Sequence, residues 1–122
     1  KNTKPEMRVR SRIHKAGFRY ALHKKGLPGC PDLVLPKYNT AVFVHGCFWH
    51  GHDCPRGKRP ATRKRFWNDK LDKNKLRDRL SVATLEALGW RVFVIWECSL
   101  DEGIDEIIRV LETKRSSASR VA

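Results

Sequence analysis

Residues 42–54 read Val-Phe-Val-His-Gly-Cys-Phe-Trp-His-Gly-His-Asp-Cys, and the other informative residues are those that can meet this stretch. An apolar run ends there in three histidines and two cysteines, with two adjacent aromatic residues between them. A buried strand that leads directly into metal ligands and proton carriers is typical of a reactive site at the edge of a sheet.

The composition favours a polyanionic partner. The chain has 122 residues, enough for one compact domain, and its 26 Lys and Arg against 13 Asp and Glu give a formal charge of +13. Such an excess points first to nucleic acid, second to an anionic membrane surface, and third to a merely basic protein. No run approaches the roughly 18 apolar residues that a membrane-spanning helix needs. The cysteines lie beside histidines rather than in a disulfide framework, which favours a reducing cytosol and metal binding.

The first half of the chain predicts a helix, a strand and a hairpin. The helix begins at a capping box, with Thr3 as the N-cap and Glu6 reaching back, and runs to about Ala16. Alternating apolar residues over 18–22 predict a half-buried strand.

Two short strands, 32–35 and 41–44, are joined by a turn short enough for an antiparallel hairpin. Such a hairpin places Asp32, at the start of one strand, near Val44 and His45 at the end of the other. The spacing alone therefore brings a carboxylate to the histidines.

The second half predicts a polar loop over 55–62, a long helix from about Phe66, a strand and a last helix. In the long helix the apolar residues at helical spacing are Leu76, Leu80, Ala83 and Ala87. The nearly continuous apolar run 90–96 is typical of a central strand covered on both faces, with Trp90, Phe93 and Trp96 as core residues. The last helix buries Ile104, Ile107, Ile108 and Leu111. The element order predicts a mixed sheet with helices on its faces.

Cys47, His52 and Cys54 have the identity and close spacing of zinc ligands. A tetrahedral site needs one more soft ligand, and Cys98, directly after the last predicted strand, is placed to supply it. Four protein ligands leave no open position, so such a zinc is structural. The alternative of ordinary buried thiols is weaker, because three ligands fall within eight positions. Cys30 is left as a free thiol, or as a ligand in place of Cys98.

With His52 assigned to zinc, His45 and His50 remain beside Asp32. A carboxylate that holds Mg²⁺, next to imidazoles that take a proton from water, suits phosphodiester hydrolysis. Glu6 adds an acceptor if the first helix lies across the hairpin end. Taken singly, Asp32 fits a turn carboxylate, Glu6 a cap, and each histidine a structural residue. Hydrolysis is favoured by their convergence.

Two aromatic pairs, Phe48-Trp49 and Phe66-Trp67, lie close to polar or basic residues. The second pair follows a basic run made of Arg63, Lys64 and Arg65. Exposed aromatic rings flanked by cations stack on bases or wedge between them. Core packing is the competing interpretation, and for Phe66 the two are evenly matched.

These motifs closely resemble those of the very-short-patch-repair (Vsr) DNA mismatch endonucleases, over residues 3–100. The matching segments are 27–32 (Leu-Pro-Gly-Cys-Pro-Asp), 43–54, 66–67, 89–91 and 96–98, and the second is highly specific. The resemblance implies a restriction-endonuclease-like α/β core, with a mixed central sheet flanked by helices and a structural zinc. It also implies Mg²⁺-dependent nicking of one strand on the 5′ side of the thymine in a T·G mismatch. Such mismatches arise by deamination of 5-methylcytosine, and the nick initiates very short patch repair.

The resemblance also implies roles for single residues. Asp32 corresponds to the Mg²⁺ carboxylate, helped by the backbone carbonyl of Val44, which replaces a threonine of a well-known member. His50 corresponds to the histidine that activates the attacking water, with His45 and Glu6 in support. The implied zinc ligands are Cys47, His52, Cys54 and Cys98. The aromatics implied to enter the duplex are Phe48, Trp49 and Trp67, and we expect further DNA contacts from Arg63, Lys64 and Arg65.

We therefore expect one nuclease domain over residues 1–115, a flexible tail over 116–122, and a monomer in the bacterial cytoplasm at the nucleoid. The expected partner is double-stranded DNA with a T·G mismatch, with mismatch-repair proteins as an open second partner and no membrane. Two other functions stay open: a restriction-type nuclease that cuts intact duplex, and a zinc-stabilised DNA-binding module with structural histidines. Asp32 together with His45 and His50 argues against the module, because binding alone needs none of them.

Overall fold

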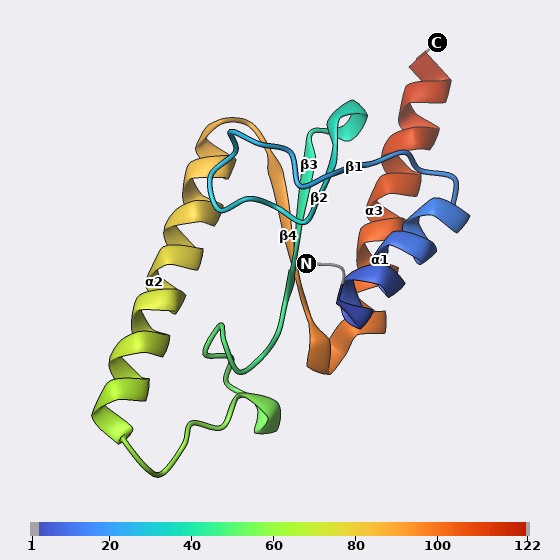
Figure 1. Ribbon diagram of the computed structural model, residues 1–122. Helices are drawn as coiled ribbons and strands as arrows, with labels where there is room; N and C mark the ends of the chain where they lie inside the picture. The colour runs from blue at the N-terminus through green and yellow to red at the C-terminus, as the bar shows by residue number, and fades with distance from the viewer. Residues whose placement is uncertain (1–2, 122) are drawn as a thin grey trace.

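A four-stranded mixed sheet forms the centre of the fold. The structure is a computed structural model that describes residues 3–121, with side chains to residue 117. The strands lie across the sheet in the order β1 (Ala21–Leu22), β2 (Leu33–Leu35), β3 (Thr40–His45) and β4 (Arg91–Trp96). β1, β2 and β3 pair antiparallel, whereas β4 runs parallel to β3 (Figure 1). The mixed sheet predicted from the sequence is confirmed.

The hairpin formed by β2 and β3 has the predicted antiparallel pairing. Leu33 lies opposite Val42, and Leu35 lies opposite Thr40. A single 3-10 turn, Pro36–Tyr38, connects the strands, and Asn39 closes it in the left-handed conformation with φ 49°. This register brings the residue before β2 beside the last residues of β3.

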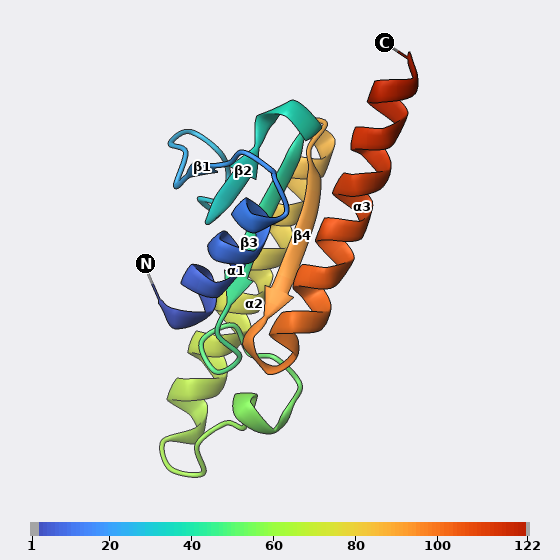
Figure 2. The same cartoon turned by 90° about the vertical axis from the view of Figure 1, so that its right-hand side faces the viewer.

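Three helices cover the two faces of the sheet (Figures 1 and 2). α1 (Lys4–Lys15) and α3 (Leu100–Val121) lie side by side on one face, and α2 (Lys64–Ala87) covers the other. Ion pairs between α1 and α3 join Arg8 to Asp101 at 2.7 Å and Arg12 to Asp105 at 2.6 Å.

The core consists of one apolar cluster on each face of the sheet. Side chains of α1 and α3 pack against alternate strand residues on one face; they include Val9, Ile13, Ile104, Ile107 and Leu111, over Leu33, Leu35 and Val42. On the other face, Leu85 of α2 packs over Val34, Ala41 and Phe43. The stripe predicted for the last helix is confirmed, since Ile104, Ile107 and Leu111 are fully buried and Ile108 packs against the same cluster.

The start of α1 forms half of the predicted capping box. The Thr3 hydroxyl accepts a hydrogen bond from the Glu6 N–H at 3.3 Å. The Glu6 carboxylate turns instead toward Arg10 and His23. α1 ends at Lys15, one residue before the predicted end near Ala16, and Gly17 follows with φ 92°.

Two strand predictions are wrong in part. The stretch 18–22 forms only the two-residue β1, whose residues are both exposed. β4 is an edge strand rather than a central one, and only Ile95 in it is buried. Its apolar run arises because helices lie on both faces: Phe93 packs with the α1–α3 cluster, and Val94 with the α2 cluster.

The apolar spacing read for the long helix does not mark its buried face. α2 buries Leu71 and Leu85, whereas Leu76 and Leu80 are 53% and 59% exposed. The helix is long and covers an open sheet, so only a narrow stripe of it reaches the core.

α3 continues as helical backbone to Val121, so the stretch from residue 116 that was expected as a flexible tail is helical to that point; Ala122 lies outside the described residues. The division into a domain at 1–115 and a flexible tail stays a prediction. Within the described part of the chain, the helices are too short or too polar to cross a membrane.

Candidate active site

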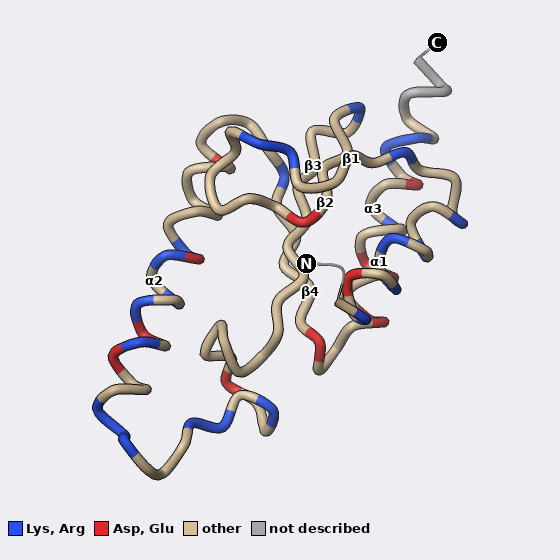
Figure 3. The backbone as a smooth tube through the Cα atoms, viewed as in Figure 1, with Lys and Arg blue, Asp and Glu red and all other residues tan. Residues whose placement is uncertain are grey.

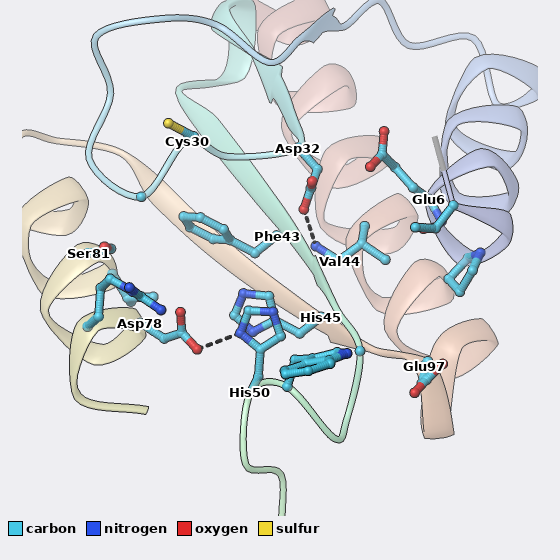
Figure 4. Close-up of a pocket in the computed structure, with 17 residues that line it drawn as sticks. Glu6, Cys30, Asp32, Phe43, Val44, His45, His50, Asp78, Ser81 and Glu97 are labelled. Atoms are coloured by element: carbon cyan, nitrogen blue, oxygen red, sulfur yellow. Dashed lines mark hydrogen bonds and ion pairs between the residues drawn. The ribbon is translucent and has the colours of Figure 1, made fainter. Parts of the chain in front are cut away.

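The hairpin end brings Asp32 to β3, as predicted. The Val44 N–H donates a hydrogen bond of 2.7 Å to Oδ2 of Asp32, and the Asp32 N–H donates to the Val42 carbonyl at 2.9 Å (Figure 4). Burial raises the pKa of Asp32; the Val44 hydrogen bond acts against this shift, and the nearby Glu6 carboxylate adds to it. The main chain of β3 thus fixes the carboxylate. A cation bound beside it would stabilise its charged form, which burial and the Glu6 carboxylate disfavour.

His45 and His50 form a stacked pair at the end of β3. Their ring centroids are 3.7 Å apart and the ring planes differ by 1°. Burial, with a smaller contribution from the charge of His50, lowers the pKa of His45 to about 4, so His45 is neutral at physiological pH.

A carboxylate that the sequence analysis did not identify holds His50. Oδ2 of Asp78, in the middle of α2, lies 2.6 Å from Nδ1 of His50 (Figure 4). An Nδ1–H donated to this carboxylate leaves Nε2 as the nitrogen that can accept a proton from water. Asp78 falls seven residues after Leu71 and seven before Leu85, the two buried leucines of α2. This heptad spacing is the sequence signal by which Asp78 could have been found.

Glu6 lies on α1, which covers the face of the sheet opposite α2, and it approaches Asp32 from that side. It is 2% exposed, and its carboxylate pairs with the Arg10 guanidinium and lies 3.3 Å from Nε2 of His23. Glu6, His23 and Asp32 each offer a ligand atom within 4.8 Å of the others. His23 was not a candidate in the sequence, because it reaches the site only through the bend after β1.

One cavity of about 440 Å³ is lined by both carboxylates and by both histidines with Asp78. Figure 4 shows Glu6 and Asp32 on one side of this space and His50 with Asp78 on the other. The predicted convergence of Asp32, Glu6, His45 and His50 on one site is therefore what the structure has.

The predicted zinc ligands converge in a separate cluster. Ligand atoms of Cys47, His52, Cys54 and Cys98 lie within 4.8 Å of one another, and Sγ of Cys98 is 3.5 Å from Nδ1 of His52. Cys30 is exposed and lines the cavity of Asp32 and His50 instead, so Cys98 is the cysteine that joins this cluster.

The donor set fits a tetrahedral zinc ion. None of these three cysteines forms a disulfide. Without a cation, burial raises the pKa of Cys47 to about 12. At Cys54 burial also acts to raise the pKa, but hydrogen bonds from Cys47 and the Gly57 N–H outweigh it and lower the pKa. Three sulfurs and one imidazole gathered around one point are the ligands that structural zinc takes.

The aromatic residues gather beside the cavity. The ring of Phe48 lies 5.0 Å from Trp49 and 5.4 Å from Trp67, and the two tryptophans are 5.9 Å apart. Trp49 is 53% exposed. For Phe66 the sequence left core packing and contact with DNA bases evenly matched. Its side chain is 45% exposed and lies under the Arg63 guanidinium at 4.4 Å, so it is not a core residue. We call Phe48, Trp49 and Trp67 the aromatic trio.

Comparison with known proteins decides the family. The family model described as DNA mismatch endonuclease Vsr matches residues 1–56. The type II nicking enzyme V.XorIIP of Xanthomonas oryzae pv. oryzae is 50% identical over 102 residues, which are 84% of this chain and 75% of that protein.

The chain belongs to the Vsr family of DNA mismatch endonucleases. The DNA mismatch endonuclease Vsr of Escherichia coli K12 is 44% identical over 100 residues, 82% of this chain and 64% of that protein. Among solved structures, the catalytic domain of the homing endonuclease I-Bth0305I superposes with a TM-score of 0.53 at 23% identity, over 91% of this chain and 92% of that chain. The likeness to the homing endonuclease concerns the fold, and it agrees with the predicted restriction-endonuclease-like core.

Membership of the Vsr family makes this chain a DNA endonuclease and implies a divalent metal in its reaction. The cavity between α1, the hairpin end and α2 is where the polar side chains for such chemistry meet. The structure adds Asp78 and His23 to the candidate site residues that were predicted from the sequence.

Proposed function

We propose that this Vsr-family endonuclease nicks one strand of duplex DNA on the 5′ side of the thymine in a T·G mismatch, in a Mg²⁺-dependent reaction that initiates very short patch repair. The observation that carries the proposal is the single cavity in which Asp32 and Glu6 face the His50–Asp78 pair, beside an aromatic trio in which Trp49 is exposed. The proposal includes action as a monomer in the cytoplasm, on DNA at the nucleoid, with mismatch-repair proteins as further partners.

Asp32 is the proposed anchor for Mg²⁺. Its Oδ2 accepts a hydrogen bond from the Val44 N–H, which fixes the carboxylate, and Glu6 contributes a second oxygen donor within 4.8 Å. Magnesium prefers such hard oxygen ligands and keeps several waters, so the backbone carbonyl of Val44 and the substrate phosphate complete the proposed set. When bound there, Mg²⁺ supplies charge neutralisation at the scissile phosphate.

His50 is the proposed general base. Asp78 holds its Nδ1–H, so Nε2 accepts the proton as water attacks phosphorus. The Asp78 carboxylate then stabilises the imidazolium that forms. His45, which is neutral and stacked on His50, limits the positions that the His50 ring can adopt.

The aromatic trio is the proposed reader of the mismatch. Rings that enter a duplex must unstack base pairs, which costs a few kcal/mol and costs least at a mispair. Lys70 lies over the Trp49 ring at 5.9 Å and Arg63 over Phe66, so cations accompany the rings. The first turns of α2 and the loop before it carry many of the basic residues (Figure 3) and support binding to phosphates; Arg63, Lys64 and Arg65 are among them.

Cys47, His52, Cys54 and Cys98 are the proposed ligands of a structural zinc. The residues between Cys47 and Cys54 carry both His50 and Trp49, so a cation there would fix the segment that delivers the base and the wedge.

A duplex panel tests the proposed function. Zinc-loaded protein is incubated with duplexes that differ only in one pair, T·G, T·A or C·G, each with Mg²⁺ or with a chelator of Mg²⁺. We expect one nick, 5′ of the mispaired thymine, only in T·G and only with Mg²⁺. Cutting of all three duplexes would support a restriction-type nuclease instead, and binding without any nick would support a DNA-binding module.

A further inference from the structure

The segment Trp96-Glu97-Cys98 at the end of β4 is only partly explained by the sites above. Cys98 belongs to the thiol cluster, whereas the sequence suggested that Trp96 is a core residue. Trp96 is instead half-buried and lies between the zinc cluster and the catalytic histidines.

The indole of Trp96 contacts a ring on each side. It stacks on His52 with centroids 3.9 Å apart and planes 9° from parallel. Its other contacts are edge-on, with His45 at 5.1 Å and His50 at 6.3 Å. The parallel register of β3 and β4 places His45 opposite Trp96, so the sheet itself fixes this arrangement.

Glu97 anchors the same segment through its side chain. Its Oε1 accepts a hydrogen bond of 3.0 Å from the Cys47 N–H, and its side chain lines the catalytic cavity. Two consecutive residues, Trp96 at the end of β4 and Glu97 directly after it, thus contact the ring of one proposed zinc ligand, the backbone of another and the rings of His45 and His50.

Apart from Trp96, Asp78 holds His50, whereas the His45 ring has only ring contacts, with His50 and Phe43. Nδ1 of His45 is buried and has no hydrogen-bond partner among the described residues. A second cavity of about 590 Å³ opens on the other side of the histidine pair and is lined by Trp96, Val94 and Val82. Without the indole, the His45 ring would have room to shift into that space, and the His50 ring stacked on it would lose its present position against the Asp78 carboxylate.

We propose that Trp96 is a positioning residue of the nicking reaction, whose indole sets the catalytic histidines against the ring of the zinc ligand His52. The inference rests on the proposed function of this site, because it assigns the effect of Trp96 to His50 acting as base. Its consequence is that the zinc cluster determines the geometry of the base as well as the stability of the loop.

Three variants test the proposal on zinc-loaded protein: Trp96→Leu, Trp96→Phe and the control Trp90→Leu. Trp90 flanks the other end of β4 and packs against the α2 cluster, away from the histidines. Single-turnover nicking of a T·G duplex, duplex affinity and the rate of zinc loss to a chelator are measured at a temperature where each variant is folded.

We expect Trp96→Leu to nick about 10- to 100-fold more slowly, since small misplacements of a catalytic group cost this much. Duplex affinity should change less than about threefold, because the phosphate contacts remain. Trp96→Phe should recover part of the rate, Trp90→Leu should retain it, and zinc should leave Trp96→Leu faster than the parent.

Nuclear magnetic resonance supplies a readout that does not need activity. The ring protons of His52 lie over the indole face, so they should be shifted upfield in the parent and should move to ordinary positions in Trp96→Leu, with those of His45 and His50 moving as well. Equal nicking by parent and Trp96→Leu, or equal slowing by Trp90→Leu, would overturn the inference.

If Trp96→Leu does not fold, Trp96→Phe against Trp90→Phe gives the same comparison. If the parent itself does not nick T·G, the proposed function fails. The histidine spectra and the zinc release then decide on Trp96 alone, and unmoved spectra would reject it.

Discussion

At His50, the two ring nitrogens have different surroundings, and this difference defines what the residue can do. Nδ1 meets the Asp78 carboxylate at 2.6 Å, while the ring stacks on a His45 that is held neutral by burial. A base needs one fixed tautomer, and a carboxylate on the distal nitrogen is the usual way in which proteins fix it.

Asp78→Asn should therefore slow single-turnover nicking by about 100-fold or more, because the amide keeps the shape but not the charge that stabilises the imidazolium. Zinc content and duplex affinity should be unchanged. Asp72→Asn is the matched control, since Asp72 lies on the same helix in an exposed ion pair with Arg59 at 2.7 Å. Asp78→Asn nicking at the rate of Asp72→Asn would remove Asp78 from the account.

At the same scale, sequence reasoning found the residues that lie within one short stretch or at a strand end. Asp32 and His45 follow from the hairpin register, and Cys98 from its place after a strand. His23 reaches the site through packing between distant segments, which no local spacing shows. For Asp78 the heptad Leu71–Asp78–Leu85 was a signal, but the sequence does not say that this stripe of α2 is the buried one.

At the scale of elements, the loop between β1 and β2 is packed closely on α2 across the catalytic cavity. Gly29 has φ +73°, and a Cβ added there would lie 2.6 Å from Cβ of Ser81. Gly26, in the same loop, has φ +90° but nothing within 4 Å of such a Cβ. Both glycines have a left-handed backbone, but only Gly29 has a close neighbour. Substituting each one therefore measures the cost of backbone strain separately from the cost of steric contact.

Gly29→Ala should lower the free energy of unfolding by about 2–4 kcal/mol, as strain and overpacking add. Gly26→Ala should lower it by only about 1 kcal/mol, the cost of the left-handed backbone. Urea denaturation of both variants measures this difference. Equal losses would mean that the close approach of the loop to Ser81 has no energetic weight.

The hairpin, α1 and α3 were predictable because their periods and turn residues are local signals. The position of β4 at the sheet edge was not predictable. An apolar run indicates that both faces of a strand are covered, but it does not indicate whether strands lie on both sides of it. The buried stripe of α2 was missed because apolar spacing does not show which face of a helix meets the sheet: Leu76 and Leu80 lie on the side of α2 opposite Leu71 and Leu85 and stay exposed.

At the scale of the whole molecule, the thiol cluster joins the loop after β3 to the end of β4. These segments are separated by all of α2, so a cation held there would close a long loop of the chain. The cluster thus connects the two halves of the fold as well as supporting the catalytic segment.

Protein purified without added zinc should carry about one zinc ion per chain, and its removal by a strong chelator should lower the melting temperature by more than about 10 °C, a loss of a few kcal/mol. Cys98→Ser should lose the metal, and Cys30→Ser, which alters a cysteine outside the cluster, should keep it. Less than half a zinc per chain, with no change in melting temperature on chelation, would reject the site.

The most direct test of the central claim is the single-turnover nicking rate of Asp32→Asn on a T·G duplex with Mg²⁺, in protein shown to contain zinc and to bind the duplex. The account predicts a loss of about 1,000-fold or more, equivalent to about 4 kcal/mol of transition-state stabilisation, with duplex affinity within about threefold of the parent. Nicking at the parent's rate would contradict the claim that this cavity is the catalytic centre.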